Sequence, residues 1–383
     1  MRILADENIP LLQPFFGGLG ELVTLPGRAI DRAAVKHADI VLVRSITPVN
    51  ADLLADTPVR FVGTATIGTD HIDQAALASM GIGFANAPGS NADSVVEYVI
   101  SSLLWIAERE GFLLRERTVG IIGVGNVGGR LAERLSRLGV KILLCDPPRV
   151  DAEPEETQHF VDLETLLTEA DVISCHVPLV REGAYPTHHL LDEKRLKSLK
   201  PDTVLVNTSR GSVVDNQALK ARLKDLGDLL TIMDVFEREP ELDPELISLC
   251  DLATPHIAGY SLDGKMRGSE MIYQAVCQHF GLPARQKLGG LLPEPWLKRL
   301  GFSPDADPIW TLRAAVRACY DPRDDDAALR LALRRELPAQ AYDRLRREYH
   351  TRREFTTIKI KVRKKSSEMG NILTAAGFSI REA

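Results

Sequence analysis

Cysteine, long apolar runs and an excess of charge are all scarce in this 383-residue chain, and each scarcity excludes a class of protein. No apolar segment approaches the roughly 20 residues that span a bilayer. The longest, Val95–Ala107, is interrupted by Glu97 and predicts a buried helix. The start of the chain carries acids and lacks the apolar core of a signal peptide. A net charge of −6 offers no general attraction for nucleic acid or anionic membrane, so we expect neither as a partner.

The cysteines are too few and too irregularly spaced for a disulfide framework or a metal centre. There are five of them, an odd number, and no two have the spacing of metal ligands: Cys145, Cys175, Cys250, Cys277 and Cys319. We therefore expect reduced thiols, a cytoplasmic protein and no metal site. At roughly 100–200 residues per domain, the length predicts two or three domains.

Strand-like and helix-like segments alternate in the first 90 residues, which predicts a parallel sheet with crossover helices. The expected strands are Arg2–Ala5, Ile40–Arg44 and Arg60–Gly63. Helices are expected at Asp31–Ala38 and Asn50–Ala55, followed by a longer one at Asn91–Glu110.

The alternation becomes more regular from Thr118 and predicts a doubly wound α/β domain. The expected strands are Thr118–Gly123, Lys141–Cys145, Val172–Cys175, Thr203–Asn207 and Thr231–Val235. The expected helices are Gly125–Leu138, Leu163–Glu169 and Asp215–Leu226.

A third region follows a linker rich in glycine and proline near residues 281–295. It predicts helices at Trp310–Cys319 and Asp325–Glu336, and a half-buried strand at Thr357–Val362, where apolar and charged residues alternate. The segment Arg344–Lys365 is rich in arginine and lysine. It is either a solvated face or a site for an anionic substrate or a partner chain.

A dinucleotide fingerprint, Gly123-x-Gly125-x-x-Gly128, lies between an expected strand and an expected helix. The first glycine permits a tight turn, the second lets backbone approach a pyrophosphate, and the third lets the helix pack on the strand. Asn126 and Val127 would then open the helix, whose free N–H groups favour phosphate.

An acid follows the fingerprint at the distance where a ribose-binding carboxylate is expected. Asp146 ends the next strand, about 20 residues downstream. A carboxylate there would repel a 2′-phosphate, which favours NAD over NADP, although Arg149 nearby weakens that preference.

Three polar side chains follow later strands of the same predicted sheet, where ligands bind in such folds. Arg210 suits a substrate carboxylate because its planar fork matches one. His256 suits a general base because imidazole titrates near neutral pH. Glu239 would orient that imidazole by accepting a hydrogen bond from its other nitrogen. Asp234, in the same segment as Glu239, is expected to hold the nicotinamide end of the cofactor.

With Asn207-Thr-Ser-Arg-Gly211, Asp234-Val-Phe-Glu-Arg-Glu-Pro240 and Pro255-His256, the chain resembles the D-2-hydroxyacid dehydrogenase family over about residues 1–280. The resemblance implies two Rossmann-like doubly wound parallel-sheet domains: a substrate-binding lid at 1–92 plus 257–282, and an NAD domain at 93–256. It also implies cofactor contacts from Gly259 and the turn His176-Val177-Pro178, with Val177 acting through its backbone. The α+β region 283–383 would be a C-terminal dimerisation domain, which makes a homodimer the expected assembly.

One branch of this family shares further stretches with the chain, among them Ala5–Pro10, Val43–Thr47 and Gly63–Asp73. That resemblance implies a small phosphorylated 2-hydroxy acid as substrate. It also implies substrate contacts from Ser45, Thr66 and Tyr260. Arg44 would help to neutralise a phosphate, or else is a structural residue at the strand end.

Two alternatives stay open from the sequence. The chain could act on another D-2-hydroxy acid, such as 3-phosphoglycerate or glycerate, because those enzymes share the Arg, Glu and His motifs. It could instead be an NADH-sensing interaction protein of the same fold. The patterned apolar segments near the C-terminus favour a folded tail and speak against that second alternative.

Overall fold

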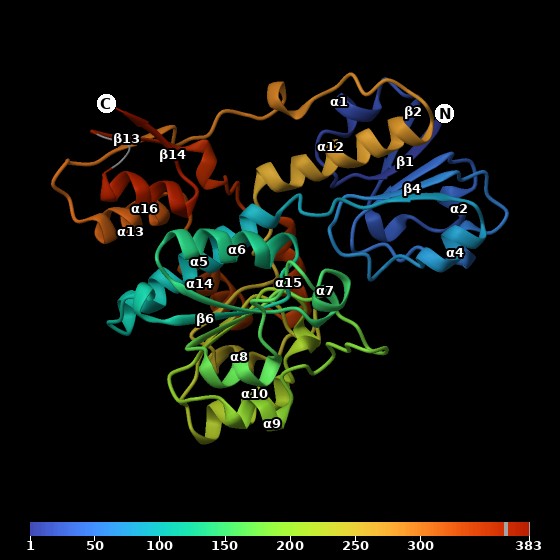
Figure 1. Ribbon diagram of the computed structural model, residues 1–383. Coiled ribbons are helices and arrows are strands. Elements are labelled where there is room, and N and C mark those ends of the chain that lie inside the picture. The colour runs from blue at the N-terminus through green and yellow to red at the C-terminus, as the bar shows by residue number, and fades with distance from the viewer. Residues whose placement is uncertain (364–366, 383) are drawn as a thin grey trace. The chain divides into compact units, whose positions relative to one another are not determined.

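The computed structural model describes residues 1–363 and 367–382, and the chain divides into two compact units (Figure 1). The first unit comprises Met1–Asn91 and Ser261–Glu294, and the second comprises Ala92–Tyr260 and the chain from Pro295 onward. The three-domain division expected from the sequence is finer and stays a prediction. In the part of the chain described, no helix combines the length and apolarity needed to cross a membrane. Lys364 and Lys365, the end of the basic segment, lie outside the described residues.

The first unit is built on a parallel five-stranded sheet in the order β2-β1-β3-β4-β5. Its strands are β1 (Arg2–Asp6), β2 (Glu21–Leu25), β3 (Ile40–Val43), β4 (Phe61–Thr64) and β5 (Gly83–Ala85). Its helices are α1 (Leu12–Phe16), α2 (Arg32–Val35), α3 (Ala51–Leu54), α4 (Gln74–Ser79) and α12 (Leu262–His279). The strand order reverses between β1 and β3. In open parallel sheets, ligands bind at the carboxyl ends of the strands beside such a reversal.

The second unit contains a parallel six-stranded sheet in the order β11-β10-β9-β8-β6-β7. Its strands are β6 (Thr118–Ile122), β7 (Lys141–Cys145), β8 (Val172–Cys175), β9 (Val204–Asn207), β10 (Leu230–Met233) and β11 (Leu252–Ala253). The helices of this part are α5 (Ala92–Arg109), α6 (Asn126–Arg137), α7 (Pro147–Ala152), α8 (Leu163–Glu169), α9 (Glu193–Ser198), α10 (Asn216–Asp225) and α11 (Pro244–Leu249). Here the order reverses between β6 and β8.

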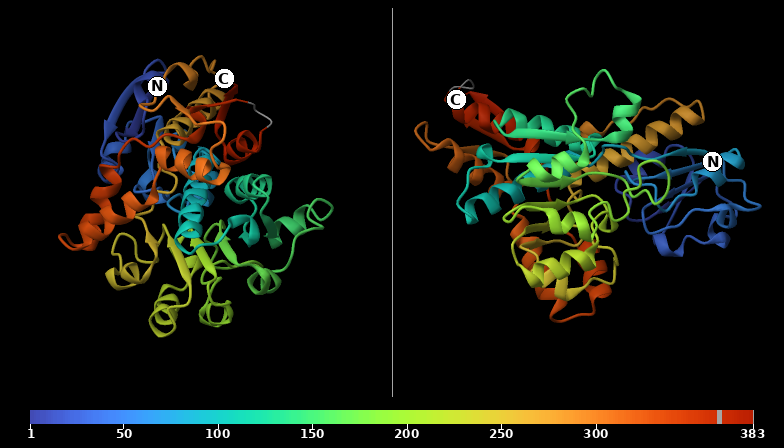
Figure 2. Two further views of the ribbon diagram at one scale, coloured as in Figure 1. Left: turned by 90° about the vertical axis from the view of Figure 1, so that its left-hand side faces the viewer. Right: turned by 60° about the horizontal axis from the view of Figure 1, so that its bottom comes forward.

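Local sequence explains why these elements begin where they do. Aspartates cap many helices of the second unit, each accepting a hydrogen bond from a backbone N–H of the first turn, among them Asp162, Asp192, Asp215 and Asp243. The central strands β8 and β9 are buried along their whole length, because helices cover both faces of the sheet (Figure 2).

The C-terminal part of the second unit adds helices and a small sheet. Three strands pair in parallel in the order β12-β13-β14: β12 (Arg299–Gly301), β13 (Lys359–Val362) and β14 (Ser379–Glu382). The helices are α13 (Pro308–Cys319), α14 (Pro322–Leu333), α15 (Pro338–Arg347) and α16 (Glu368–Ala376). Because its strands pair in parallel and helices connect them, this region is α/β. Leu312, Phe355 and Leu373 join the hydrophobic cluster around α5, so this region shares a core with the six-stranded sheet.

Candidate active site

The glycine fingerprint forms the turn between β6 and α6. Gly123 has a φ of +87°, and a Cβ there would lie 2.7 Å from the carbonyl oxygen of His176. A Cβ on Gly128 would lie 1.9 Å from the carbonyl oxygen of Gly123, so only glycine lets α6 pack this close to its strand. Among the described residues, no heavy atom other than those of the glycine and its chain neighbours lies within 4 Å of a Cβ built on Gly125, and no side chain caps α6 by a hydrogen bond. The turn therefore has space and free N–H groups where a pyrophosphate would bind.

Asp146 ends β7 beside this turn. Its carboxylate accepts hydrogen bonds from the backbone N–H of Val124 at 2.8 Å and of Arg149 at 3.2 Å. Arg149 also donates to the Val124 carbonyl oxygen at 3.1 Å and forms an ion pair with Glu153 at 2.7 Å. The acid is thus fixed next to the fingerprint, and its contact with a ribose stays a prediction.

The turn His176-Val177-Pro178 follows β8, on the other side of the point where the strand order reverses. The His176 imidazole lies between the hydroxyls of Ser174 (2.8 Å) and Thr208 (3.4 Å). Burial lowers the pKa of His176 to about 3, so this ring is neutral at physiological pH. Its backbone approaches Gly123, which brings the predicted cofactor residues of β6 and β8 together.

Glu239 and His256 form a hydrogen-bonded pair. Nδ1 of His256 lies 2.7 Å from Oε2 of Glu239, and Oε1 of Glu239 accepts a hydrogen bond from the Phe236 N–H at 2.8 Å. Tyr342 donates its hydroxyl to Oε2 at 2.7 Å. Burial opposes ionisation of Glu239, but the charge and hydrogen bond of His256, with the two other donors, hold its pKa below its usual value. An ionised partner suits an imidazole that must accept a proton on its other nitrogen.

Asp234 fixes the backbone on which His256 is carried. His256 has a φ of +57°, a left-handed conformation that costs a non-glycine residue on the order of 1–3 kcal/mol. The buried Asp234 carboxylate accepts hydrogen bonds from the N–H groups of Ile257 (2.8 Å) and Ala258 (3.0 Å) and from the Thr254 hydroxyl (2.6 Å). Both oxygens are therefore engaged within the protein, and a contact with nicotinamide stays a prediction.

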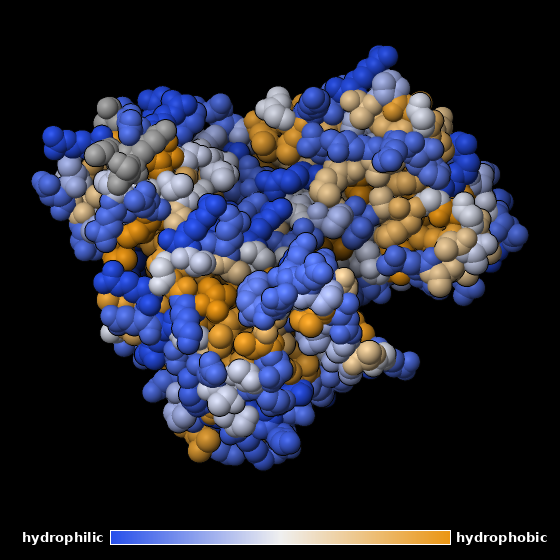
Figure 3. Space-filling view, viewed as in Figure 1, coloured by the Kyte–Doolittle hydropathy of each residue, from blue (hydrophilic) through white to orange (hydrophobic). Residues whose placement is uncertain are grey.

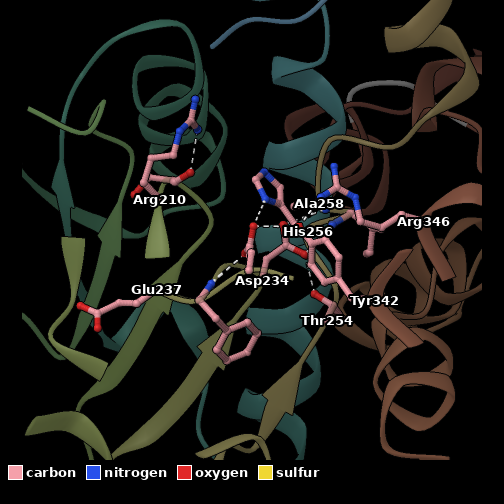
Figure 4. Close-up of polar contacts among 12 residues, drawn as sticks. Arg210, Asp234, Glu237, Thr254, His256, Ala258, Tyr342 and Arg346 are labelled. Carbon is pink, nitrogen blue, oxygen red and sulfur yellow. Dashed lines mark hydrogen bonds and ion pairs between the residues drawn. The ribbon is translucent and has the colours of Figure 1, made fainter. Parts of the chain in front are cut away.

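Arg210 lies in the loop that follows β9. Its carbonyl oxygen accepts a hydrogen bond from the Asn207 side chain at 2.9 Å, and its guanidinium donates to the Ser209 carbonyl at 2.8 Å. The next residue, Gly211, packs so closely on the loop after β10 that a Cβ would lie 2.0 Å from the Phe236 carbonyl carbon. The loops that carry Arg210 and Glu239 are thus in contact. Figure 4 shows the Arg210 side chain to one side of the His256 ring.

The predicted substrate residues Arg44, Ser45 and Thr66 belong to the first unit, after β3 and β4. The Thr66 hydroxyl bonds to the Thr64 hydroxyl at 2.8 Å and donates to the Gly68 carbonyl at 2.9 Å. These bonds stabilise the loop that follows β4. The substrate role of the three residues stays a prediction.

Tyr260 and Gly259 end the loop that carries His256. The Tyr260 hydroxyl accepts two hydrogen bonds from Arg346, at 3.0 and 2.7 Å, and its ring meets Tyr349 edge-on with centroids 5.6 Å apart. Gly259 lies between Tyr260 and Ala258, whose carbonyl oxygen accepts a hydrogen bond from Arg352 at 3.0 Å.

The C-terminal region supplies side chains to the site that sequence reasoning missed: two arginines of the arginine-rich segment, and Tyr342, which precedes that segment. Tyr342, Arg346 and Arg352 contact Glu239, Tyr260 and Ala258 respectively. Arg352 is only 2% exposed, so part of this segment is neither a solvated face nor available to a partner. The only sequence signal was the density of arginine, which does not distinguish inward from outward side chains.

A second polar cluster lies in the same unit. His189, Asp215 and Glu237 each offer a possible ligand atom, and these atoms lie within 4.8 Å of one another. The three residues are far apart in the sequence, so spacing gave no sign of them.

Two family models match the chain. Residues 99–258 match the D-isomer specific 2-hydroxyacid dehydrogenase, NAD binding domain, and residues 291–377 match a domain of unknown function (DUF3410). Among curated proteins, the erythronate-4-phosphate dehydrogenase of Chromohalobacter salexigens is 54% identical over 381 residues, covering 100% of this chain and 99% of its own. That of Pseudomonas paraeruginosa is 55% identical over 362 residues, covering 94% and 95%.

Solved structures match about three quarters of the chain. The D-lactate dehydrogenase of Aquifex aeolicus, complexed with NAD and lactic acid, is 27% identical with a TM-score of 0.61, covering 73% of this chain and 96% of its own. The NAD-bound 3-phosphoglycerate dehydrogenase of Entamoeba histolytica is 26% identical with a TM-score of 0.62, covering 73% and 95%. The parallel-sheet fold expected from the sequence is confirmed, and so is NAD as the cofactor.

Proposed function

The chain belongs to the erythronate-4-phosphate dehydrogenase family, within the D-isomer specific 2-hydroxyacid dehydrogenases, and we propose that its substrate is 4-phospho-D-erythronate. It is an NAD-dependent oxidoreductase. The product would be 3-hydroxy-2-oxo-4-phosphobutanoate, on the route to pyridoxal 5′-phosphate. The observation that carries the proposal is the 2.7 Å contact between Glu239 and His256, on a sheet whose glycine turn is open for a dinucleotide.

The proposed chemistry assigns one task to each member of the trio. His256 takes the proton of the C2 hydroxyl on Nε2, because Nδ1 is engaged by Glu239. Glu239, ionised by its donors, stabilises the imidazolium that results. Arg210 pairs with the substrate carboxylate through its planar guanidinium. NAD, when bound, supplies the acceptor for the hydride that leaves C2.

The residues around the fingerprint fit that cofactor. The unfilled space at Gly125 and the uncapped start of α6 suit the pyrophosphate, and Asp146 would meet the adenosine ribose. Asn126, Val127, His176, Val177, Pro178, Asp234 and Gly259 are the further cofactor contacts that we propose. Ser45, Thr66, Tyr260 and Arg44 are the proposed substrate contacts.

The test is the substrate profile of the purified protein with NAD. NADH formation followed at 340 nm should be fastest with 4-phosphoerythronate, and slower with 3-phosphoglycerate and glycerate. His256→Asn should lower turnover by roughly 10²–10⁴-fold with little change in NAD affinity. Equal or faster turnover of 3-phosphoglycerate would reassign the substrate, and NADH binding without turnover of any hydroxy acid would favour the sensing protein.

The assembly that we propose is a cytoplasmic homodimer formed through the C-terminal region. Large apolar side chains are exposed there: Trp296 is 91% exposed and Trp310 is 59% exposed. Apolar residues also appear among polar ones on the face of Figure 3 where α13 and α16 lie. Light scattering on the purified protein measures the mass and tests this assembly.

A further inference from the structure

The C-terminal region contacts the two loops that carry Glu239 and His256 at three separate points. Tyr342 of α15 bonds to Glu239, Arg346 of α15 bonds to Tyr260, and Arg352 bonds to the Ala258 carbonyl. All of these residues belong to the second unit. The region corresponds to the family model whose function is unknown, residues 291–377.

Tyr342 is placed to hold the Glu239 carboxylate. Its hydroxyl donates at 2.7 Å to Oε2, the same oxygen that lies 2.7 Å from Nδ1 of His256 (Figure 4). The tyrosine ring is buried in the hydrophobic cluster on one face of the six-stranded sheet. A packed ring on a helix gives the hydroxyl a fixed position, which a solvated side chain would lack.

Arg346, one helical turn further along α15, holds the hydroxyls of both Tyr342 and Tyr260. Its Nη1 donates to Tyr342, while Nε and Nη2 donate to Tyr260. Its positive charge lies behind the Tyr342 hydroxyl, so it polarises that O–H toward Glu239. Glu239, Tyr342 and Arg346 therefore form a chain of hydrogen bonds that ends on a cation.

Arg352 stabilises the end of the loop that carries His256. It donates to the carbonyl oxygens of Ala258 (3.0 Å) and Ser94 (2.5 Å), and its guanidinium lies 3.7 Å from the centre of the Tyr320 ring. The loop that carries His256 is thus fixed by Asp234, which follows β10, and by side chains from the C-terminal region.

The solved dehydrogenases match only part of this chain. Two of them are matched over 95% and 96% of their own length, while about a quarter of this chain is unmatched. The unmatched share is close to the size of the C-terminal region. The model of the NAD-binding domain ends at residue 258, and a separate model matches residues 291–377, so Tyr342 and Arg346 belong to a region that the NAD-domain model does not include.

We propose that the C-terminal region is a functional part of the active site, in which Tyr342 is a positioning residue for the Glu239–His256 pair and Arg346 holds Tyr342 in place. This role rests on the proposed dehydrogenase function. By positioning the Glu239–His256 pair, the C-terminal region would contribute to catalysis whether or not it also forms a dimer interface.

The test removes only the hydroxyl, with Tyr342→Phe in the full-length enzyme. Tyr349→Phe is the matched control, because Tyr349 also lies in the C-terminal region and donates its hydroxyl to a carboxylate, Asp325, at 2.9 Å. Tyr342→Phe should lower kcat about tenfold, the worth of one hydrogen bond, with KM for NAD unchanged. Tyr349→Phe should leave kcat near the wild-type value.

A purely structural role would not change how the pair titrates, so the pH dependence separates the two explanations. Without the Tyr342 donor, Oε2 binds a proton more strongly and stabilises the imidazolium more. The acid limb of kcat/KM should therefore move up by about 0.5 pH unit, with Asp234 and Arg346 still present in the variant. In a Glu239→Gln background, Tyr342→Phe should add almost nothing.

A readout without substrate keeps this inference separate from the proposed function. The ¹⁵N resonances of the His256 ring, assigned by their loss in His256→Asn, should report the same upward shift in Tyr342→Phe and none in Tyr349→Phe. If Tyr342→Phe does not fold, Arg346→Lys serves in its place, because it keeps the charge and loses the fork. A Tyr342→Phe enzyme that matches Tyr349→Phe in kcat and titration, or effects additive with Glu239→Gln, would overturn the proposal.

Discussion

Because of Glu97, the free energy of unfolding should fall as the pH rises. This glutamate lies in the first half of α5 and is fully buried. Oε1 accepts a hydrogen bond from the Phe355 N–H at 2.9 Å and lies 3.7 Å from the Arg134 guanidinium. Among the described residues, Oε2 has no hydrogen-bond partner. Burial and the nearby Glu354 carboxylate raise the pKa of Glu97 to about 8, against the opposing effect of Arg134, Arg352 and the Phe355 N–H.

The sign and size follow from proton linkage. Between the ordinary value of 4.5 and about 8, the folded protein holds a proton on Glu97 that the unfolded chain releases. The free energy of unfolding should therefore fall by about 1.4 kcal/mol per pH unit across that interval and level off above it. Glu97→Gln cannot ionise, so its stability should lack this component. The amide nitrogen would have no acceptor, which costs about 1–3 kcal/mol at every pH.

Urea unfolding at several pH values from 5.5 to 9, followed by circular dichroism, measures the slope apart from that constant offset. The difference in unfolding free energy between Glu97→Gln and the wild type should move in favour of the variant by about 2–3 kcal/mol between pH 6 and pH 8. Glu155→Gln, at an exposed position, serves as the control and should track the wild type. Parallel curves for the wild type and Glu97→Gln over this range would show that Glu97 is ionised in the folded protein and would refute the reasoning.

Two further substitutions test the site. Asp234→Asn would place an amide NH2 group against the Ala258 N–H, which then has no acceptor. We expect urea unfolding to show a loss of about 2 kcal/mol of stability, and we expect kcat to fall. An unchanged kcat would exclude Asp234 as the support of His256. The added methyl group of Gly125→Ala meets nothing within 4 Å among the described residues, so the variant should fold normally. It should nevertheless raise KM for NAD by tenfold or more. Gly129→Ala, whose methyl group makes only an ordinary contact at 3.7 Å, is the control and should leave KM for NAD unchanged. A normal KM in Gly125→Ala would place the pyrophosphate elsewhere.

The apolar pattern predicted much of the central fold. The strands Lys141–Cys145 and Val172–Cys175 and the helix Leu163–Glu169 have the predicted bounds. They could be predicted because strands in a covered parallel sheet are continuous apolar runs and because Asp162 marks the start of the helix. The edge strand Glu21–Leu25 was missed, since it is only partly buried and mixes polar with apolar residues.

The contact between Glu239 and His256 could be predicted because both residues follow strands of one sheet, whose carboxyl ends meet at one edge. The support from the C-terminal region was not predicted, because it joins distant residues. Tyr342 and Glu239 are 103 positions apart, and Arg346 and Tyr260 are 86 positions apart. No periodicity or spacing relates such pairs, and only the packing of α15 brings them together.

The left-handed backbone of His256 explains why this much support is needed. The segment Thr254-Pro255-His256 has no glycine to make that conformation favourable, so the surrounding structure must offset its cost. Asp234 does so by accepting hydrogen bonds from two backbone N–H groups, each contributing about 0.5–1.5 kcal/mol. Those bonds fix the backbone but leave the imidazole free to rotate about its side-chain bonds. Orientation of the ring depends on Glu239, and the position of Glu239 in turn depends on Phe236 and Tyr342. The geometry of the proposed base is therefore a property of the assembled second unit, and the loop that carries the histidine does not determine it alone.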